Sequence, residues 1–452
     1  MRPSLPAAVR ELSAPSRLFL VFTGVNVVSW QCVVGPALVL FARAVAMPPA
    51  LVGVLLSFMP LSMLLVLLAY PLVEWLGPKR LLFYSWLGRN LLLLPVFGMP
   101  WVMARWGEAA GWHLLLFATL GFSVIRAVGV GGWYPWLHEI VPRERMGTYL
   151  SLETMLSQAI AILLAFAMAR VLAMAVGLER FLIIYGVGVA AGLLSVLLIA
   201  RIPGGAGLSG EGRATYDPGR ALGRVLADRG YLAFLALAVL GLSSLMWLNA
   251  ATVMYLRDVL RYSETHIMLL LAAGGVGVAL SVRFWGRVAD RFGSVPAMIQ
   301  LLCGHALFAL AWLGLLPAGR LTDWLVLPAL VFTTVFNAAF VMVAARGMLC
   351  RVHEEGRVGY TTLWILSVSV AHGVPPILAG ALIDQLGLAG FRLCFVVAGL
   401  CGLAAAGLMF RLPTEEGKPP VQELHHLIRA SQPLRSLGRV FWITLGLGEK
   451  RE

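Results

Sequence analysis

Twelve apolar runs, each about as long as a membrane-spanning helix, dominate this sequence of 452 residues. A hydrocarbon core roughly 30 Å thick needs about 20 apolar residues of helix to cross it. Backbone groups at that depth must pair within a helix or a closed barrel, and these runs lack the alternation of barrel strands. We therefore predict twelve helices, at 17–43, 50–73, 80–103, 112–136, 148–173, 180–201, 231–259, 264–286, 294–317, 322–346, 358–383 and 391–411.

The charged residues support the same class of protein. They make up only 13% of the chain, and the mean hydropathy is +0.86, which is typical of membrane proteins. If both termini are cytoplasmic, the tails and inner loops hold 25 of the 35 Lys and Arg residues and the outer loops hold 8, while Arg89 and Arg126 fall within spans. This positive-inside bias predicts a bacterial inner (plasma) membrane protein with cytoplasmic termini. The net charge of +13 does not predict nucleic-acid binding, because no soluble basic domain carries it.

Cysteine usage and motif content argue against an enzyme. The five cysteines are scattered and form no CxxC pair, so neither a metal site nor a disulfide framework is expected. HExxH, P-loop and GxSxG motifs are missing from the sequence. We expect no catalytic residues, metal or cofactor.

A polar, Gly-rich interruption and an internal repeat divide the chain. Residues 202–230 separate six runs from six more, which predicts a linker. The pair Glu74 and Gly77 precedes the pair Asp290 and Gly293 by 216 positions, and "RMG" at 145–147 precedes "RVG" at 357–359 by 212. The predicted parts are a cytoplasmic tail (1–16), a first bundle (17–201), the linker (202–230), a second bundle (231–411) and a basic cytoplasmic tail (412–452).

The stretch "GRVADRFG" at 286–293 resembles the signature loop of the major facilitator superfamily, in which Gly-x-x-x-Asp-Arg-x-Gly joins the second and third helices of a six-helix half. "PLVEWLGPKR" at 71–80 is a weaker copy, and "VPRERMGTY" at 141–149 resembles the superfamily's loop between helices 4 and 5. The resemblance implies an all-α polytopic membrane protein with twelve transmembrane helices in two six-helix bundles. It also implies a central cavity and alternating access.

The signature loop and its copy predict a conformational latch. The sequence predicts a turn in which glycines let helix ends approach and an acid caps a helix and pairs with Arg. By the resemblance, these contacts break when the bundles rock; the alternative is that the charges only solvate a short loop. The predicted latch residues are Glu74, Gly77, Arg80, Gly286, Asp290, Arg291 and Gly293.

Two charges inside the spans are candidates for substrate binding or proton coupling, because buried charge is costly in a membrane. Arg126 lies near the middle of helix 4, and Glu153, on helix 5, is its expected partner. A purely structural ion pair is the alternative. "RAVGVGG" at 126–132 also resembles the helix 4 motif of drug-proton antiporters, although the Gly-Pro motif of their helix 5 is missing.

Other polar and aromatic residues complete the predicted site. In the resembled fold, helices 1, 4, 7 and 10 line the cavity, which favours Asn26, Arg126, Trp247 and Asn337, with Trp30 and Trp364 as walls. Interhelical hydrogen bonding competes for each Asn, and lipid contact for each Trp. His372, within helix 11, is a candidate proton carrier, with a local hydrogen bond as its alternative.

These observations predict a secondary transporter of a small organic solute, proton-coupled and monomeric in the lipid bilayer. Since no ATP-binding motif is present, an ion gradient or the solute's own gradient would drive it. A multidrug antiporter is one alternative, and a transport-inactive receptor or scaffold is another. The tail at 412–452 carries apolar residues at helical spacing followed by arginines, so it either lies on the inner leaflet or is disordered.

Overall fold

The structure, a computed structural model, describes residues 12–142, 145–174, 176–205, 223, 225–317, 319–352 and 357–413, and all regular elements in these ranges are helical. Twelve helices are long and apolar enough to cross a membrane, which confirms the predicted fold class. Their ranges are 14–44, 49–66, 78–106, 108–130, 146–174, 179–201, 229–259, 264–292, 294–314, 322–349, 359–386 and 388–409.

The chain forms two compact units, one of residues 1–215 with 262–269 and the other of residues 216–261 with 270–452. Before residue 215 the elements are α2 (Ala14–Val34), α3 (Pro36–Ala44), α4 (Pro49–Ser62), η1 (Met63–Leu68), α5 (Ala69–Leu76), α6 (Pro78–Leu91), η2 (Leu94–Gly98), α7 (Met99–Trp106), α8 (Glu108–Val130), α9 (Trp133–Ile140), α10 (Met146–Met174) and α11 (Glu179–Arg201). After it they are α13 (Arg229–Met254), η4 (Tyr255–Val259), α14 (Glu264–Phe292), α15 (Ser294–Ala311), η5 (Trp312–Gly314), α16 (Arg320–Leu349), α17 (Arg357–Leu386) and α18 (Leu388–Met409).

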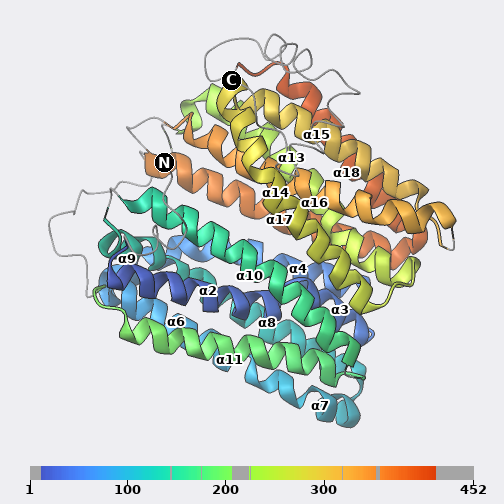
Figure 1. Ribbon diagram of the computed structural model, residues 1–452, viewed down its shortest axis with the longest axis horizontal. Coiled ribbons are helices and arrows are strands. Elements are labelled where there is room, and N and C mark those ends of the chain that lie inside the picture. Colours follow the sequence, from blue (N-terminus) through green and yellow to red (C-terminus); the bar gives the residue numbers. More distant parts are fainter. Residues whose placement is uncertain are drawn as a thin grey trace, which may run out of the picture. The chain divides into compact units, whose positions relative to one another are not determined.

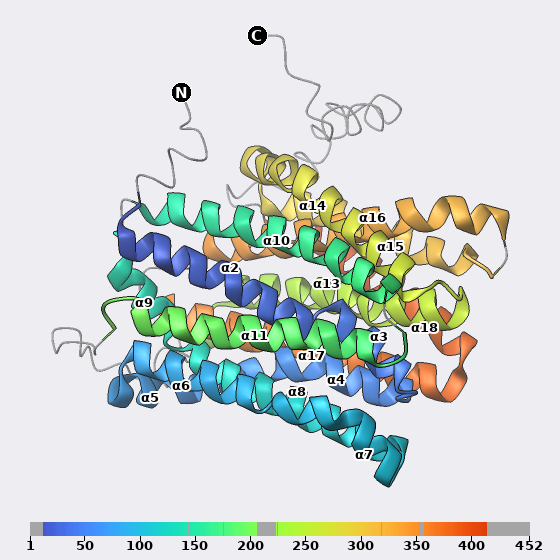
Figure 2. The same ribbon diagram turned by 60° about the horizontal axis from the view of Figure 1, so that its bottom comes forward.

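In the first unit, α2 is the central element of the packing. It lies along α11 and contacts α10, while α6 packs against α8 (Figures 1 and 2). Its buried Phe19 and Phe22 sit 5.3 and 5.1 Å, centroid to centroid, from the Trp133 ring of α9. Phe19 meets this ring edge-to-face and Phe22 meets it at a tilt. Aromatic pairs in such arrangements add about 0.5–1.5 kcal/mol each beyond area burial, so they help to fix α2 against its neighbours.

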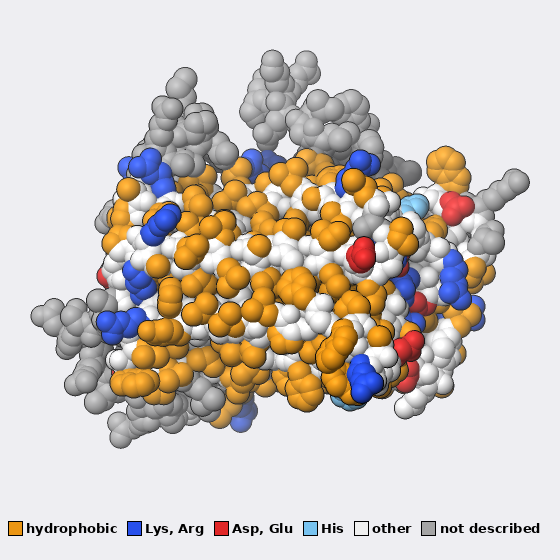
Figure 3. Space-filling model, turned by 90° about the horizontal axis from the view of Figure 1, so that it is seen from below, with side chains coloured by type: hydrophobic (Ala, Val, Ile, Leu, Met, Phe, Trp, Pro, Cys, Tyr) orange, Lys and Arg blue, Asp and Glu red, His pale blue; other side chains and the backbone are white. Residues whose placement is uncertain are grey.

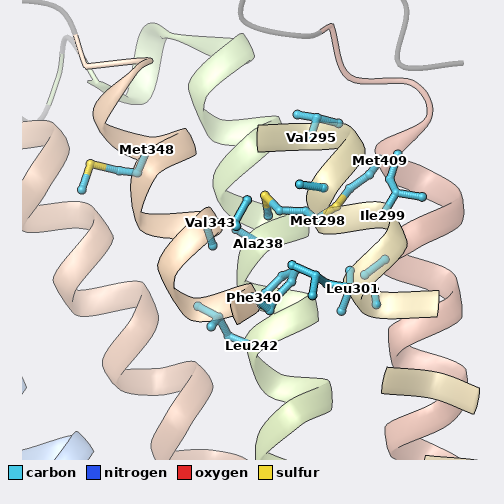
Figure 4. Packing of buried hydrophobic residues seen from close by; sticks show 14 of the residues in the cluster. Ala238, Leu242, Val295, Met298, Ile299, Leu301, Phe340, Val343, Met348 and Met409 are labelled. Carbon is cyan, nitrogen blue, oxygen red and sulfur yellow. The ribbon is translucent and has the colours of Figure 1, made fainter. Parts of the chain in front are cut away.

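In the second unit, α13 packs against α17 and α18, and α15 packs against α16 and α18. Figure 4 shows their core, in which Phe340 of α16 meets Leu242 of α13 and Leu301 of α15. A Cβ added at Gly241 would lie 2.5 Å from the Phe340 ring. Because lipid is as apolar as Leu, such close packing, rather than escape from water, holds membrane helices together.

The outer surface is that of a membrane protein. Figure 3 shows one face that is largely covered by hydrophobic side chains, with few charged side chains among them. Phe117, Leu163 and Leu197 are each at least 60% exposed on long apolar helices. Such side chains suit contact with lipid tails.

The signature stretch is helical over most of its length, which corrects the predicted turn at 286–294. The helix α14 continues through Phe292, and the reversal is made at Gly293, whose φ is +89°. Gly77 makes the same reversal between α5 and α6, with φ +80°. This region of φ is costly for residues with a Cβ, so each turn needs its Gly.

Some predictions fall on residues outside the described ranges. These are most of the N-terminal tail, most of the 202–230 linker, residues 143 and 144 of the loop before α10, and the tail beyond Pro413. The division into tails, bundles and linker remains a prediction.

Candidate functional site

The first unit holds a polar group between three apolar helices. Asn26 of α2 accepts two hydrogen bonds through its Oδ1 atom, one from Trp86 Nε1 at 2.9 Å and one from Arg89 Nη2 at 2.6 Å. Trp86 and Arg89 are separated by nearly one turn of α6, so both point toward α2. A single amide oxygen therefore orients an indole and a guanidinium.

Arg89 is completely buried. Its guanidinium lies 4.0 Å from the Trp86 ring centroid and 4.8 Å from the Phe122 ring centroid, so two aromatic rings neighbour the cation. Its Nε and Nη1 atoms have no hydrogen-bond partner among the described residues. Cation–π contacts give up to about 2 kcal/mol each when desolvated, which offsets part of the cost of burial but satisfies no N–H group.

Arg126 lies one turn after Phe122 on α8, and Phe122 is the ring that Arg89 contacts, so the two positive charges lie on the facing sides of α6 and α8. Its side chain is half-buried, and its Nη1 donates to Met63 Sδ at 3.6 Å. A thioether is a weak acceptor, so this bond leaves a charged group poorly satisfied.

The predicted ion pair between Arg126 and Glu153 is wrong. Among the described residues Arg126 meets Met63 and no carboxylate, and Glu153 has neighbours in Tyr134 and Tyr149. The reason is packing, because α10 lies against α2 and α11, whereas α8 lies against α6 and α4. Helices 4 and 5 are consecutive in the chain, but that does not make them neighbours at this depth.

The remaining predicted lining residues are half-buried and are not brought together by any described contact. Trp30, Trp247 and Asn337 make no hydrogen bond within the described part of the chain. Trp364 stacks on Phe234, with ring centroids 6.4 Å apart, at the edge of the second unit's core. His372 Nδ1 lies 2.8 Å from Val368 O on its own helix. This is the local hydrogen bond that the sequence analysis gave as the alternative to a role in carrying protons.

The acid of the predicted latch pairs with an Arg that was not among the predicted latch residues. Asp290 accepts from Arg346 Nε at 3.0 Å, and Arg346 Nη1 also donates to Ser294 Oγ at 2.7 Å, so α14, α15 and α16 are joined. Arg291 lies over the ring of its neighbour Phe292 and pairs with no described acid. Asp290 does not cap α15, and a Cβ at Gly286 would meet open space, so Gly286 is not a close-approach glycine.

In the first-half copy of the signature stretch, at 71–80, a Lys and not an acid makes the contact between helices. Glu74 and Arg80 are exposed and have no described partner, whereas Lys79 Nζ donates to Ala200 O at 3.2 Å and Ile202 O at 2.6 Å. These carbonyls end α11, where a cation is favoured by the helix dipole. Lys79 thus joins α6 to α11.

Sequence reasoning missed Arg89, Lys79 and Arg346. Arg89 was visible as a charge within an apolar run, and its spacing of three from Trp86 and one from Asn90 was a further signal. Lys79 and Arg346 were visible only as basic residues near helix ends, and their partners depend on which helices pack together.

The fold is that of solved membrane transporters. The nucleoside transporter NupG (D323A mutant) is similar with a TM-score of 0.67 and 11% identity, over 88% of this chain and 99% of that one. The inward-open xylose transporter XylE from E. coli gives 0.65 and 13%, over 91% and 98%. A bacterial homologue of the iron transporter ferroportin gives 0.63 and 17%, over 91% and 99%. No curated protein matches the sequence.

The family model of the Major Facilitator Superfamily matches residues 233–448. That is the second half of the chain, and the solved structures extend the likeness in fold to nearly its full length. The twelve candidate spans among the described residues indicate a multi-pass membrane protein. Residues 233–448 are therefore similar to the Major Facilitator Superfamily, and the chain as a whole shares its fold with the solved transporters.

Proposed function

We propose that this protein is a secondary transporter that moves a small organic solute by alternating access, driven by a proton gradient or by the solute's own gradient. The observation that carries the proposal is the buried Arg89, which is held by Asn26 of α2 and contacts Phe122 one turn before Arg126 on α8. Ionisable residues at membrane depth are costly and commonly mark solute or ion pathways. The solved proteins of similar fold are named for nucleoside, xylose and iron, so the fold leaves the solute open.

Arg126 is the proposed solute contact, since it is half-buried and its described acceptor is only a thioether. Trp30 and Asn26 on α2 are proposed as further solute contacts of the first half, and Trp247, Asn337 and Trp364 are the proposed solute contacts of the second half. Glu153 and His372 are the proposed proton carriers, and Glu153 would act without the ion pair to Arg126 that the sequence predicted.

We propose that the ion pair between Asp290 and Arg346 is a latch that holds one state of the transport cycle. It joins the ends of α14 and α16, and Gly293 makes the tight turn between α14 and α15. An exposed ion pair is weak, typically under about 1 kcal/mol, which suits a contact that must break in every cycle.

The bias of basic residues supports a bacterial inner membrane location with both termini cytoplasmic. We propose a monomer as the working unit.

Uptake and efflux by proteoliposomes test the proposal. The purified full chain is reconstituted and given a panel of carboxylates, amines, sugars and nucleosides, with and without a proton gradient, and protein-free vesicles serve as the control. Saturable flux of one class, faster with the gradient, is expected. Outward flux of many unrelated cations would favour a multidrug antiporter, and absence of flux for the whole panel would contradict the proposal.

A further inference from the structure

Arg89 and Arg126 form a cationic pair that no described acid neutralises. Arg89 meets Asn26, Trp86 and Phe122, and Arg126 meets Met63. The ion pairs described for the chain involve neither residue. Two adjacent cations in a poor dielectric repel each other, so an anion between or beside them would relieve both the repulsion and the unmet N–H groups.

Buried polar atoms without partners gather on the same helices. Besides Arg89 Nε and Nη1, they include Ser29 Oγ on α2, Asn90 Oδ1 on α6, and Thr119 Oγ1 and Ser123 Oγ on α8. Thr119, Ser123 and Arg126 follow one another at spacings of four and three, so they share one face of α8. Native interiors leave few polar groups unpaired, and several unpaired groups beside a buried cation point to a missing polar partner.

The second half of the chain shows that the cations are not required by the packing. The 216-residue spacing that relates Glu74 to Asp290 relates Arg89 to His305 of α15. His305 is also buried, near Ser244, Ala306 and Gly402, and it brings no fixed charge, although its Nδ1 and Nε2 atoms also have no hydrogen-bond partner among the described residues. The same place in a similar helix bundle is therefore filled without a guanidinium.

We propose that the solute carries an oxyanion, a carboxylate or a phosphate, which Arg126 binds directly while Arg89 holds a second positive charge behind it. The oxyanion replaces Met63 Sδ as the acceptor of Arg126, because charge-assisted bonds to oxygen are shorter and about twice as strong as neutral ones. Asn26 acts as a positioning residue for Arg89. This inference rests on the proposed function and names the class of its solute.

Thermal unfolding in lipid nanodiscs tests the inference without any flux. The full chain is heated with sodium phosphate, sodium benzoate or neutral benzamide, at an ionic strength held constant with sodium chloride. An oxyanion present at tenfold its Kd should raise the unfolding temperature by on the order of 2 °C or more. Arg126→Gln should lose this shift. Arg105→Gln, which removes an exposed Arg of the same half, should keep it.

Each outcome bears on a separate claim. No shift with benzoate or phosphate in the unchanged protein, or equal shifts in Arg126→Gln, would overturn the inference. A shift with phosphate alone would assign the site to a free inorganic anion and not to an organic solute. Binding without flux in proteoliposomes would contradict the proposed function while leaving the anion site. Flux of a neutral solute that survives Arg126→Gln would contradict the anion site and would leave the proposed transport function standing.

Discussion

The two halves of the chain fill corresponding places with different chemistry. In the first half, Gly192 of α11 lies against Ser29 of α2 and Asn90 of α6, next to the buried Arg89. In the second half, Gly402 of α18 lies against Ser244 of α13 and against Ala306 and His305 of α15. A serine and a glycine recur in each half. At the third helix, however, the first half has Arg89 and Asn90 on α6, whereas the second half has the uncharged His305 and Ala306 on α15.

This difference separates what packing needs from what function adds. Ser244 Oγ donates to Ala398 O at 2.7 Å, so the second-half serine is satisfied, whereas Ser29 Oγ has no partner among the described residues. In the second half, α13 and α18 pack together through Ser244 and Gly402, and no buried cation lies beside them in the described part of the chain. Both ring nitrogens of His305 in the second half also lack a described partner, so what distinguishes the first half is the buried fixed charge of Arg89, which we attribute to a binding site.

The largest effect is expected from removing the amide that holds Arg89. Asn26→Leu deletes the acceptor of Trp86 and Arg89 together and should lower the free energy of unfolding by about 3 kcal/mol, because a buried charge loses its hydrogen bond. Ser244→Ala in the second half, which loses one neutral bond, should cost only about 1 kcal/mol. Unfolding in mixed detergent micelles measures the loss of stability in each variant. Equal losses for Asn26→Leu and Ser244→Ala would contradict the proposed difference between the two halves.

Glycine substitutions compare the packing of the two halves. A Cβ at Gly192 would overlap Asn90 Oδ1 and lie 2.7 Å from Ser29 Oγ, whereas a Cβ at Gly402 would lie 3.0 Å from Ser244 Oγ with its other neighbours at 3.6 Å. Overpacking makes Gly192→Ala the worse variant, by about 2 kcal/mol, and Gly402→Ala should cost less than about 1 kcal/mol. The same micelle unfolding gives the order, and a larger loss at Gly402 would contradict it.

The latch predicts a change of conformation with little change in stability. Asp290 is 72% exposed, so Asp290→Asn should alter the free energy of unfolding by no more than about 0.5 kcal/mol. The variant should nevertheless shift the protein toward its inward-open state, read as faster labelling of cysteines placed at cavity positions from the cytoplasmic side. Glu74→Gln, at the first-half copy, is the matched control and should label like the unchanged protein. If Asp290→Asn also labels at the unchanged rate, Asp290 is only a surface residue.

The smallest effect concerns Arg126 and Glu153. Since they do not pair in the structure, the stability changes of Arg126→Leu and Glu153→Leu should add in the double variant within about 0.5 kcal/mol. A double variant markedly more stable than the sum of its parts would restore the ion pair that the sequence suggested and would weaken the case for an unneutralised cationic pair.

The fold was predictable because membrane-spanning helices can be recognised from long runs of apolar residues. Each apolar run, and each chain reversal at Gly77 and Gly293, can be recognised from its own short stretch of sequence without knowing which helices pack together. The site was less predictable because it depends on which helices touch. Arg89 and Asn26 are far apart in the sequence and meet only because α6 packs near α2. Glu153 was paired with Arg126 because their helices follow each other in the chain and the two residues lie at similar depths. The partner of Asp290, Arg346, lies on α16 and carries no motif that links it to α14.

Solute flux in proteoliposomes, compared between one variant from each half, tests the central claim most directly. For the panel solute that the unchanged protein carries fastest, Arg126→Gln should lower the uptake rate at least tenfold, since one charge-assisted hydrogen bond contributes about 1.5–3 kcal/mol. His305→Gln, at the related buried region of the second half, should keep nearly the full rate. Full flux in Arg126→Gln together with loss in His305→Gln would contradict the account and move solute recognition to the second half.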